Sequence, residues 1–217
     1  MSRVTSGTFA GPAGPLEYIF NEPEETGSIR RAALLCHPHP LFGGTMNTRI
    51  VFHMNRALNE MGMPVLRFNF RGVGGSGGEH DHGQGEMEDA QAALAFLRER
   101  YPLPVVLGGF SFGSAVVLDL LARSEMPAVE RALIVGVPVV RRPMPETLIW
   151  TGPKLFISGG RDEFGSAEAV RAYFDRLEQP KRLIFFDEAD HFLTGRMDEF
   201  RNTLAANLDF EQQSGWA

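Results

Sequence analysis

Short apolar runs alternate with amphipathic stretches along most of the chain. Apolar or alternating runs predict strands over 4–10, 16–20, 32–36, 64–70, 105–107, 132–137, 154–158 and 182–186. Apolar residues spaced three and four apart predict helices over 46–61, 87–100, 111–123, 166–178 and 197–210. Strand and helix alternate from residue 32 onward, which predicts an α/β fold. We expect a mostly parallel, twisted sheet with helices on both faces.

The first two strands flank a Gly- and Pro-rich turn at residues 11–15 and are expected to add an antiparallel edge to the sheet. No repeat or long linker interrupts the remaining chain. Its 217 residues suit one domain, 1–217, and are too few for an ordinary (β/α)₈ barrel of about 250 residues. The pattern therefore predicts a single α/β domain.

Composition and charge narrow the class of partner. Hydrophobic residues make up 43% and charged residues 22%, as in soluble globular proteins. With 21 Lys and Arg against 27 Asp and Glu, the net charge is −6, which argues against nucleic acid and against an electrostatic membrane anchor. We find no signal-peptide pattern and no apolar run of about 18 residues, so we expect a cytoplasmic protein. Cys36, the single cysteine, ends an apolar run and is expected to be a buried core thiol. The oligomeric state does not follow from the sequence.

A candidate nucleophile follows the strand at 105–107. Ligands of such sheets bind beyond the carboxyl ends of the strands, where Gly109, Ser111 and Gly113 match the pattern G-x-S-x-G between a strand and a helix. A sharp turn there would strain the backbone, raise the Ser111 hydroxyl above the sheet and aim the Phe112 N–H at a developing oxyanion. The structural alternative is a glycine-rich turn in which Ser111 only caps the helix.

A serine nucleophile needs a base, and the base needs an orienting acid. His191 follows the last predicted strand, and Asp162 follows the strand at 154–158 after two glycines. Both therefore lie on the same edge of the sheet as Ser111. Weaker candidates for the acid are Glu163, Asp187 and Asp190, and the histidines not assigned to this role are His37, His39, His53, His80 and His82.

The three residues occur along the chain in the order Ser111, Asp162, His191, which is the order of the catalytic triad in α/β-hydrolases. In this respect the chain resembles the α/β-hydrolase superfamily. The similarity extends over about residues 14–210 and is greatest to the small, cap-less bacterial esterase-like group related to dienelactone hydrolases. Residues 35–44 (LCHPHPLFGG) and 69–76 (NFRGVGGS) carry it, together with the serine turn. The resemblance implies that the loop after strand 32–36 supplies a second oxyanion-hole N–H. We expect His39 in this role, or else Leu41, because prolines 38 and 40 have no N–H.

Two other motifs suggest different chemistry. Residues 72–77 match G-x-G-x-x-G, but residues 78–85 separate them from the next helix, so we expect a flexible loop anchored by Arg71 instead of a dinucleotide site. The pairs His37/His39 and His80/His82 lack a third and fourth ligand at suitable spacing. We therefore expect no cofactor and no metal.

These features predict a serine hydrolase that cleaves a carboxylic ester, or a similar acyl compound, through an acyl-enzyme. Thioester or amide hydrolysis, acyl transfer and a non-catalytic binding role remain alternatives. Phe110 and Phe192 flank the expected site, and the segment 138–151 is expected to line or cover the pocket. Phe110, Phe192 and Trp150, which belongs to that segment, are predicted to bind a small acyl substrate. Apolar residues of that segment could equally belong to the core. Residues 138–153 are too few for a cap domain, which predicts an open, shallow site.

Overall fold

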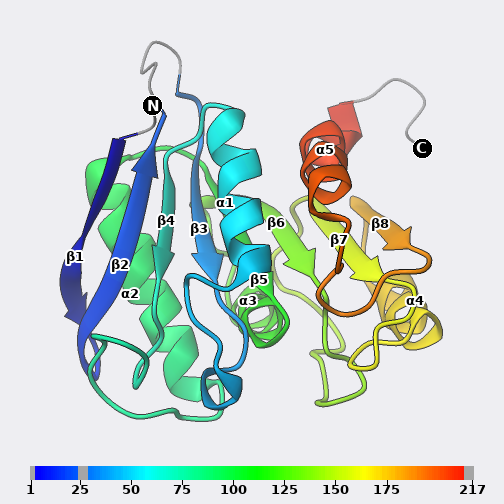
Figure 1. Ribbon diagram of the computed structural model, residues 1–217, viewed down its shortest axis with the longest axis horizontal. Helices are drawn as coiled ribbons and strands as arrows, with labels where there is room; N and C mark the ends of the chain where they lie inside the picture. Colours follow the sequence, from blue (N-terminus) through cyan, green and yellow to red (C-terminus); the bar gives the residue numbers. More distant parts are fainter. Residues whose placement is uncertain (1–2, 24–28, 213–217) are drawn as a thin grey trace.

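The computed structural model describes residues 3–23 and 29–212 and is built on one eight-stranded sheet (Figure 1). The strand order is β1-β2-β4-β3-β5-β6-β7-β8. The strands are β1 Arg3–Gly11, β2 Gly14–Glu22, β3 Ala32–Cys36, β4 Val65–Phe68, β5 Val105–Phe110, β6 Val129–Val135, β7 Lys154–Gly159 and β8 Lys181–Phe186. Strands β3 to β8 run parallel, whereas β1 pairs antiparallel with β2, and β2 with β4. The predicted parallel sheet with an antiparallel N-terminal edge is confirmed.

Helices cover both faces of the sheet, as predicted (Figure 1). Helices α1 (Arg49–Glu60) and α5 (Met197–Asn207) lie side by side on one face. The other face carries α2 (Gln84–Arg100), α3 (Phe112–Arg123) and α4 (Ala167–Arg176). Each face encloses its own apolar cluster, so the central strands are buried on both sides. All five residues of β3 are buried, which explains why its sequence is continuously apolar instead of alternating.

The element boundaries differ from the predicted ones where turns or local hydrogen bonds intervene. Helix α1 begins at Arg49 instead of residue 46, because Thr45 and Thr48 form a turn in which Thr48 N donates to Thr45 O at 3.0 Å. Strand β5 continues through Gly108 and Gly109, which the sequence suggested were part of the following turn. Short 3-10 helices at Pro40–Phe42 and Phe210–Gln212 were not predicted.

The connection between β6 and β7, residues 136–153, contains no helix and adds no cap to the sheet. Cys36 lies at the end of β3 and is fully buried, and this burial raises the pKa of its thiol. The prediction of a core thiol is thereby confirmed. None of the described helices is long and apolar enough to cross a membrane.

Candidate active site

Ser111 occupies a strained turn between β5 and α3. Its backbone lies at φ 54° and ψ −119°, a conformation that costs a non-glycine residue about 1–3 kcal/mol. Fixed hydrogen bonds hold it there: Ser111 N donates to Val135 O at 2.9 Å, and Ser114 N donates to Ser111 O at 2.9 Å. Strand β6 and the first turn of α3 thus compensate for the strain. Ser111 remains partly exposed at the carboxyl end of the sheet.

The glycines of the motif allow the close contacts that this turn requires. A Cβ atom on Gly113 would lie 2.3 Å from the carbonyl oxygen of Cys36, and one on Gly109 would lie 2.3 Å from the backbone of Gly113. Any larger residue at either position would push the start of α3 away from β3 and β5. The glycine spacing therefore allows the close backbone packing of this turn, which leaves Ser111 partly exposed.

Asp162 and His191 form a buried pair on the loops after β7 and β8. His191 Nδ1 lies 2.7 Å from Asp162 Oδ2, and both side chains are at least 95% buried. The other carboxylate oxygen of Asp162 accepts hydrogen bonds from Phe164 N at 2.7 Å and Gly165 N at 3.2 Å. These bonds hold the carboxylate in place. With Nδ1 committed to the carboxylate, the Nε2 of His191 is left for proton transfer.

The rival acids have other positions. Asp190 Oδ1 accepts hydrogen bonds from Phe192 N and Thr194 N, and the bond from Thr194 is the main reason that its pKa is lowered. It therefore stabilises its own loop, as expected. Glu163 and Asp187 are exposed. Of the described acids, Asp162 alone has a hydrogen bond to His191 in the structure.

Two further histidines have structural positions. His37 is fully buried; its Nδ1 contacts Pro38 O at 2.6 Å and its Nε2 accepts a hydrogen bond from Phe70 N at 3.0 Å. Burial lowers the pKa of His37 to about 4, so its ring is neutral at neutral pH. His53, on α1, contacts Arg201 of α5. Neither residue lines the cavity described next.

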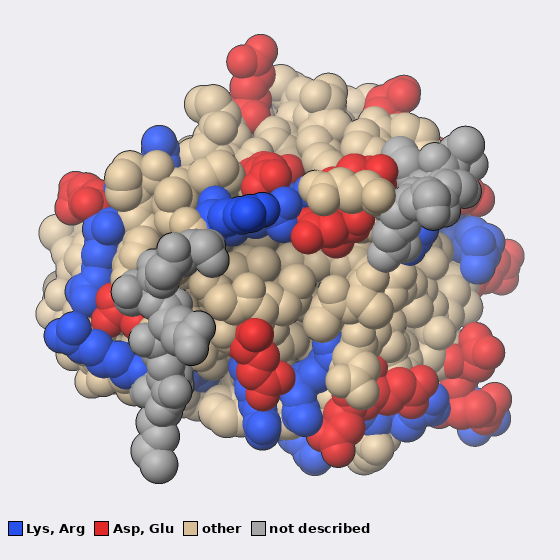
Figure 2. All heavy atoms as spheres, turned by 90° about the horizontal axis from the view of Figure 1, so that it is seen from above, with Lys and Arg blue, Asp and Glu red and all other residues tan. Residues whose placement is uncertain are grey.

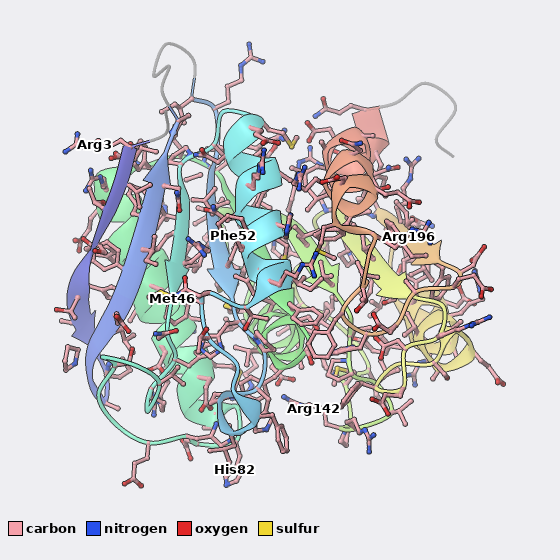
Figure 3. The ribbon with its side chains drawn as sticks, in the orientation of Figure 1. Arg3, Met46, Phe52, His82, Arg142 and Arg196 are labelled. Atoms are coloured by element: carbon pink, nitrogen blue, oxygen red, sulfur yellow. The ribbon has the colours of Figure 1, made fainter. Side chains whose placement is uncertain are left out.

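Ser111 and His191 both line one cavity of about 870 Å³ at the carboxyl end of the parallel strands. Its other walls come from the loops after β3, β4, β6 and β7 and from the segment that follows β8. They are formed by Pro38, His39, Phe42, Gly43, Gly44, Thr48, His80, His82, Phe112, Pro138, Arg141, Arg142, Phe164 and Phe192. Figure 3 shows labelled His82 and Arg142 at this edge, although they belong to segments far apart in the sequence.

The proposed oxyanion donors have different surroundings. Phe112 follows Ser111 directly as the first residue of α3 and lines the cavity, as does His39. The Leu41 N–H already donates to His39 Nδ1 at 3.3 Å, within the 3-10 turn. Of the two predicted donors on this loop, the geometry thus favours His39 over Leu41. Burial is the largest cause that lowers the pKa of the His39 side chain, followed by the charge of His80.

One predicted substrate contact reaches the cavity and two do not. Phe192 lines it and is half exposed. Phe110 is fully buried, with its ring 4.8 Å from the His191 ring, so it packs against the histidine. Trp150 donates a hydrogen bond from Nε1 to Val129 O at 3.0 Å and packs in the core beside α3. Both are corrections: these two aromatic side chains support the site or the core and do not contact a ligand in the cavity.

The glycine-rich segment after β4 is anchored as predicted. Arg71 donates to both carboxylate oxygens of the buried Asp89 at 2.8–3.1 Å, which ties this segment to α2. Within the described chain, no group of three or more His, Cys, Asp or Glu side chains is arranged to hold a metal ion.

Sequence reasoning did not single out Thr48 or Phe164, and it included Arg141 and Arg142 only as part of the segment 138–151 that was expected to line or cover the pocket. The ring of Phe164 lies 4.5 Å from that of His191, and Arg141 lies over the Phe164 ring at 4.9 Å. The available signal was the Arg-Arg pair in the loop after a predicted parallel strand, where ligands of α/β sheets bind.

Comparisons with known proteins agree with this fold. A family model described as an alpha/beta hydrolase domain matches residues 31–210. An uncharacterized protein of Rickettsia prowazekii is 34% identical, covering 90% of this chain and 85% of that protein. An alpha-beta serine hydrolase homologue from Coxiella burnetii has 33% identity and a TM-score of 0.86, covering 94% of this chain and 97% of its own. A serine hydrolase without lid from Xanthomonas campestris has 31% identity and a TM-score of 0.85, covering 96% and 95%. The chain belongs to the α/β-hydrolase family, in its cap-less form.

Proposed function

We propose that this hydrolase cleaves carboxylic esters, or closely similar acyl compounds, with Ser111 as nucleophile, His191 as base and Asp162 as orienting acid. One observation carries the proposal. A serine on a strained strand-to-helix turn lines the same cavity as a histidine whose other ring nitrogen is held by a buried carboxylate. The relatives described as serine hydrolases support the same chemistry.

In the first half of the reaction, Ser111 Oγ attacks the ester carbonyl carbon while His191 Nε2 accepts the hydroxyl proton. Asp162 holds the imidazole in the tautomer with Nδ1–H and stabilises its charged form. The N–H groups of Phe112 and His39 bind the oxyanion of the tetrahedral intermediate. The C–O bond to the alcohol then breaks, and His191 protonates the departing oxygen.

In the second half, His191 takes a proton from water as the water oxygen attacks the acyl-enzyme carbonyl. The bond between the acyl carbon and Ser111 Oγ breaks, and Ser111 recovers its proton from His191. An alcohol, an amine or a thiol could replace water as acceptor, and a thioester or an amide could replace the ester. The shape of the cavity, and not the triad, decides among these.

Labelling and turnover together test the proposal. A fluorophosphonate probe should form one adduct, located on Ser111 by peptide mass spectrometry. Ser111→Ala should lose the adduct and lower kcat for p-nitrophenyl esters by at least about 10³-fold. Ser124→Ala, at the other end of α3, is the matched control and should leave both results unchanged.

A panel of p-nitrophenyl esters, thioesters and anilides of increasing acyl length would then rank the reactions. We expect esters to be hydrolysed faster than anilides of the same acyl group. Absence of a Ser111 adduct, or full activity of Ser111→Ala with a correct fold, would refute the triad.

A further inference from the structure

The described part of the cavity wall lacks the acidic side chains that give the whole protein its negative charge. The chain carries a net charge of −6. Its cavity is nevertheless lined by two arginines and four histidines, and no Asp, Glu or Lys is among the described residues that line it. Arginine side chains in a concave, partly apolar site attract anions, because low-dielectric walls strengthen the field inside. The wall is therefore suited to a negatively charged ligand.

Arg142 contributes a buried donor that is not used. Its Nη2 donates to Asp119 Oδ2 on α3 at 2.6 Å. Its Nη1 is buried and has no hydrogen-bond partner among the described residues. A Cβ atom built on Gly83 would lie 3.4 Å from this Nη1 and 3.9 Å from the Phe112 ring. The free nitrogen thus lies near the residue that follows Ser111.

His80 contributes a second group of the same kind. Its side chain is 95% buried, and its Nδ1 lies 2.7 Å from Glu86 Oε1, a charge contact that is out of line for a hydrogen bond. Its Nε2 has no hydrogen-bond partner in the described structure. The ring packs against His39 at 4.8 Å and Phe112 at 5.6 Å, both of which line the same cavity. Buried polar atoms without partners are rare in native proteins, so two of them beside one cavity call for an explanation.

A purely structural role accounts for only half of this arrangement. The Arg142–Asp119 ion pair ties the loop after β6 to α3, and the His80–Glu86 contact ties residues 79–83 to α2. These contacts use Nη2 of Arg142 and Nδ1 of His80. They leave Nη1 and Nε2 without partners, and both residues line the cavity.

We propose that the cavity selects acyl compounds that carry a carboxylate, which Arg142 and His80 bind through Nη1 and Nε2. The proposal rests on the proposed ester hydrolysis for its catalytic meaning. In the tautomer that carries its proton on Nε2, His80 can donate a hydrogen bond to the ligand while its other ring nitrogen stays beside Glu86. The carboxylate can belong to the acyl part or to the alcohol part of the ester, since both parts extend from the same carbonyl carbon.

Two pairs of substrates of similar size show whether the carboxylate belongs to the acyl part or to the alcohol part of the ester. The mono-p-nitrophenyl ester of glutaric acid is compared with neutral p-nitrophenyl pentanoate for the acyl side. For the alcohol side, 4-acetoxybenzoate is compared with its methyl ester. We expect kcat/KM to favour the anionic member of one pair by about tenfold or more, as for one charge-assisted hydrogen bond. Added salt should reduce this preference. Rates with Ser111→Ala give the background hydrolysis.

Arg142→Gln should lower the anionic-to-neutral ratio about tenfold, and Arg142→Lys should lower it less, because lysine keeps the charge but loses the planar pair of donors. His80→Gln should lower the ratio in the same direction. The matched control is Arg161→Gln, whose arginine pairs with Glu188 on an exposed loop and does not line the cavity. It should leave the ratio unchanged.

A ratio near one for both pairs would overturn the proposal. The proposal would also be overturned if Arg142→Gln and Arg161→Gln changed the anionic-to-neutral ratio of kcat/KM equally. Titration calorimetry of monomethyl glutarate with Ser111→Ala separates this proposal from the proposed function. Binding that Arg142→Gln weakens would support the anion site even if no ester were hydrolysed. Hydrolysis of neutral esters without any such binding would refute the anion site alone.

Discussion

The two ends of the parallel sheet use arginine in opposite ways. At the amino end, Arg31 and Arg131 are surrounded by acids: Arg31 pairs with Glu130 and Asp209, and Arg131 pairs with Asp209 and Glu211. Figure 2 views the molecule from this end and shows basic and acidic side chains next to one another. At the carboxyl end, Arg142 has a single acidic partner and leaves one nitrogen free beside the cavity.

This difference suggests that the arginines at the amino end serve stability, whereas Arg142 at the carboxyl end is available to a ligand. A buried arginine whose partners are all supplied by the protein has no capacity left for a ligand. One with an unused donor carries a desolvation cost that a ligand can offset. The amino end joins the starts of strands to the end of α5, whereas the carboxyl end holds the candidate triad. Substitutions at the two ends should therefore affect different measurements.

The largest effect is expected at the carboxyl end. Asp162→Asn should lower kcat about 10⁴-fold with little change in fold, because an asparagine amide next to Nδ1 favours the wrong tautomer of His191. Steady-state kinetics with a p-nitrophenyl ester measure the loss. Asp190→Asn is the control, since Asp190 bonds only to its own loop, and its effect should stay below tenfold. A small effect of Asp162→Asn would assign the orienting role elsewhere.

Acid should destabilise the protein through His37. Its folded pKa of about 4 lies below the unfolded value of about 6.5, so between these values the unfolded chain binds one more proton. Stability is therefore full above pH 6.5 and falls by about 3 kcal/mol as the pH drops to 4. Urea unfolding between pH 7 and 5 measures the slope. His37→Gln should reduce this pH dependence by up to one proton, even if the variant is less stable than the original protein at every pH. An unchanged slope would contradict the lowered pKa of His37 as its cause.

At the amino end, Arg131→Met should lower the free energy of unfolding by about 2 kcal/mol, because it leaves the largely buried Glu211 without its cation, whereas Asp209 keeps its pair with Arg31. Ester turnover should stay the same. Urea unfolding measures the stability. The control is Arg161→Met, an exposed ion pair whose loss should cost no more than about 0.5 kcal/mol. A loss of turnover in Arg131→Met would remove the separation between the two ends.

The smallest expected effect is a gain in stability at Ser111. Glycine adopts φ 54° and ψ −119° without the penalty that a Cβ atom causes, so Ser111→Gly should be about 1 kcal/mol more stable than Ser111→Ala. Urea unfolding of the two inactive variants measures the difference. Equal stabilities would mean that the turn stores no strain.

The order of strands and helices could be predicted because a parallel sheet buried on both faces leaves continuous apolar runs, as in β3. Ser111, Asp162 and His191 could be found because the carboxyl ends of parallel strands meet at one edge. The end of β5 could not be predicted, because Gly108 and Gly109 suggest a turn in the sequence but extend the strand in the structure. A Cβ atom on Gly108 would lie 2.8 Å from the Leu35 side chain.

The direction in which side chains of the β6–β7 connection point was also beyond prediction. Trp150 and Arg142 lie in one irregular segment, where no periodicity separates inward from outward positions. Trp150 turns into the core because its Nε1 finds Val129 O, and Arg142 turns to the cavity because Asp119 on α3 holds it. Both partners belong to distant elements, so only the folded chain reveals them.

The absence of a helix between β6 and β7 has a kinetic consequence. Enzymes with mobile lids often turn over at the rate at which the lid opens and product leaves. Here the 16 residues from Pro138 to Pro153 carry no such element, and Ser111 is partly exposed and lines the cavity. Under the proposed acyl-enzyme mechanism, we therefore expect acylation or deacylation to limit turnover, so a viscous solvent should leave kcat unchanged.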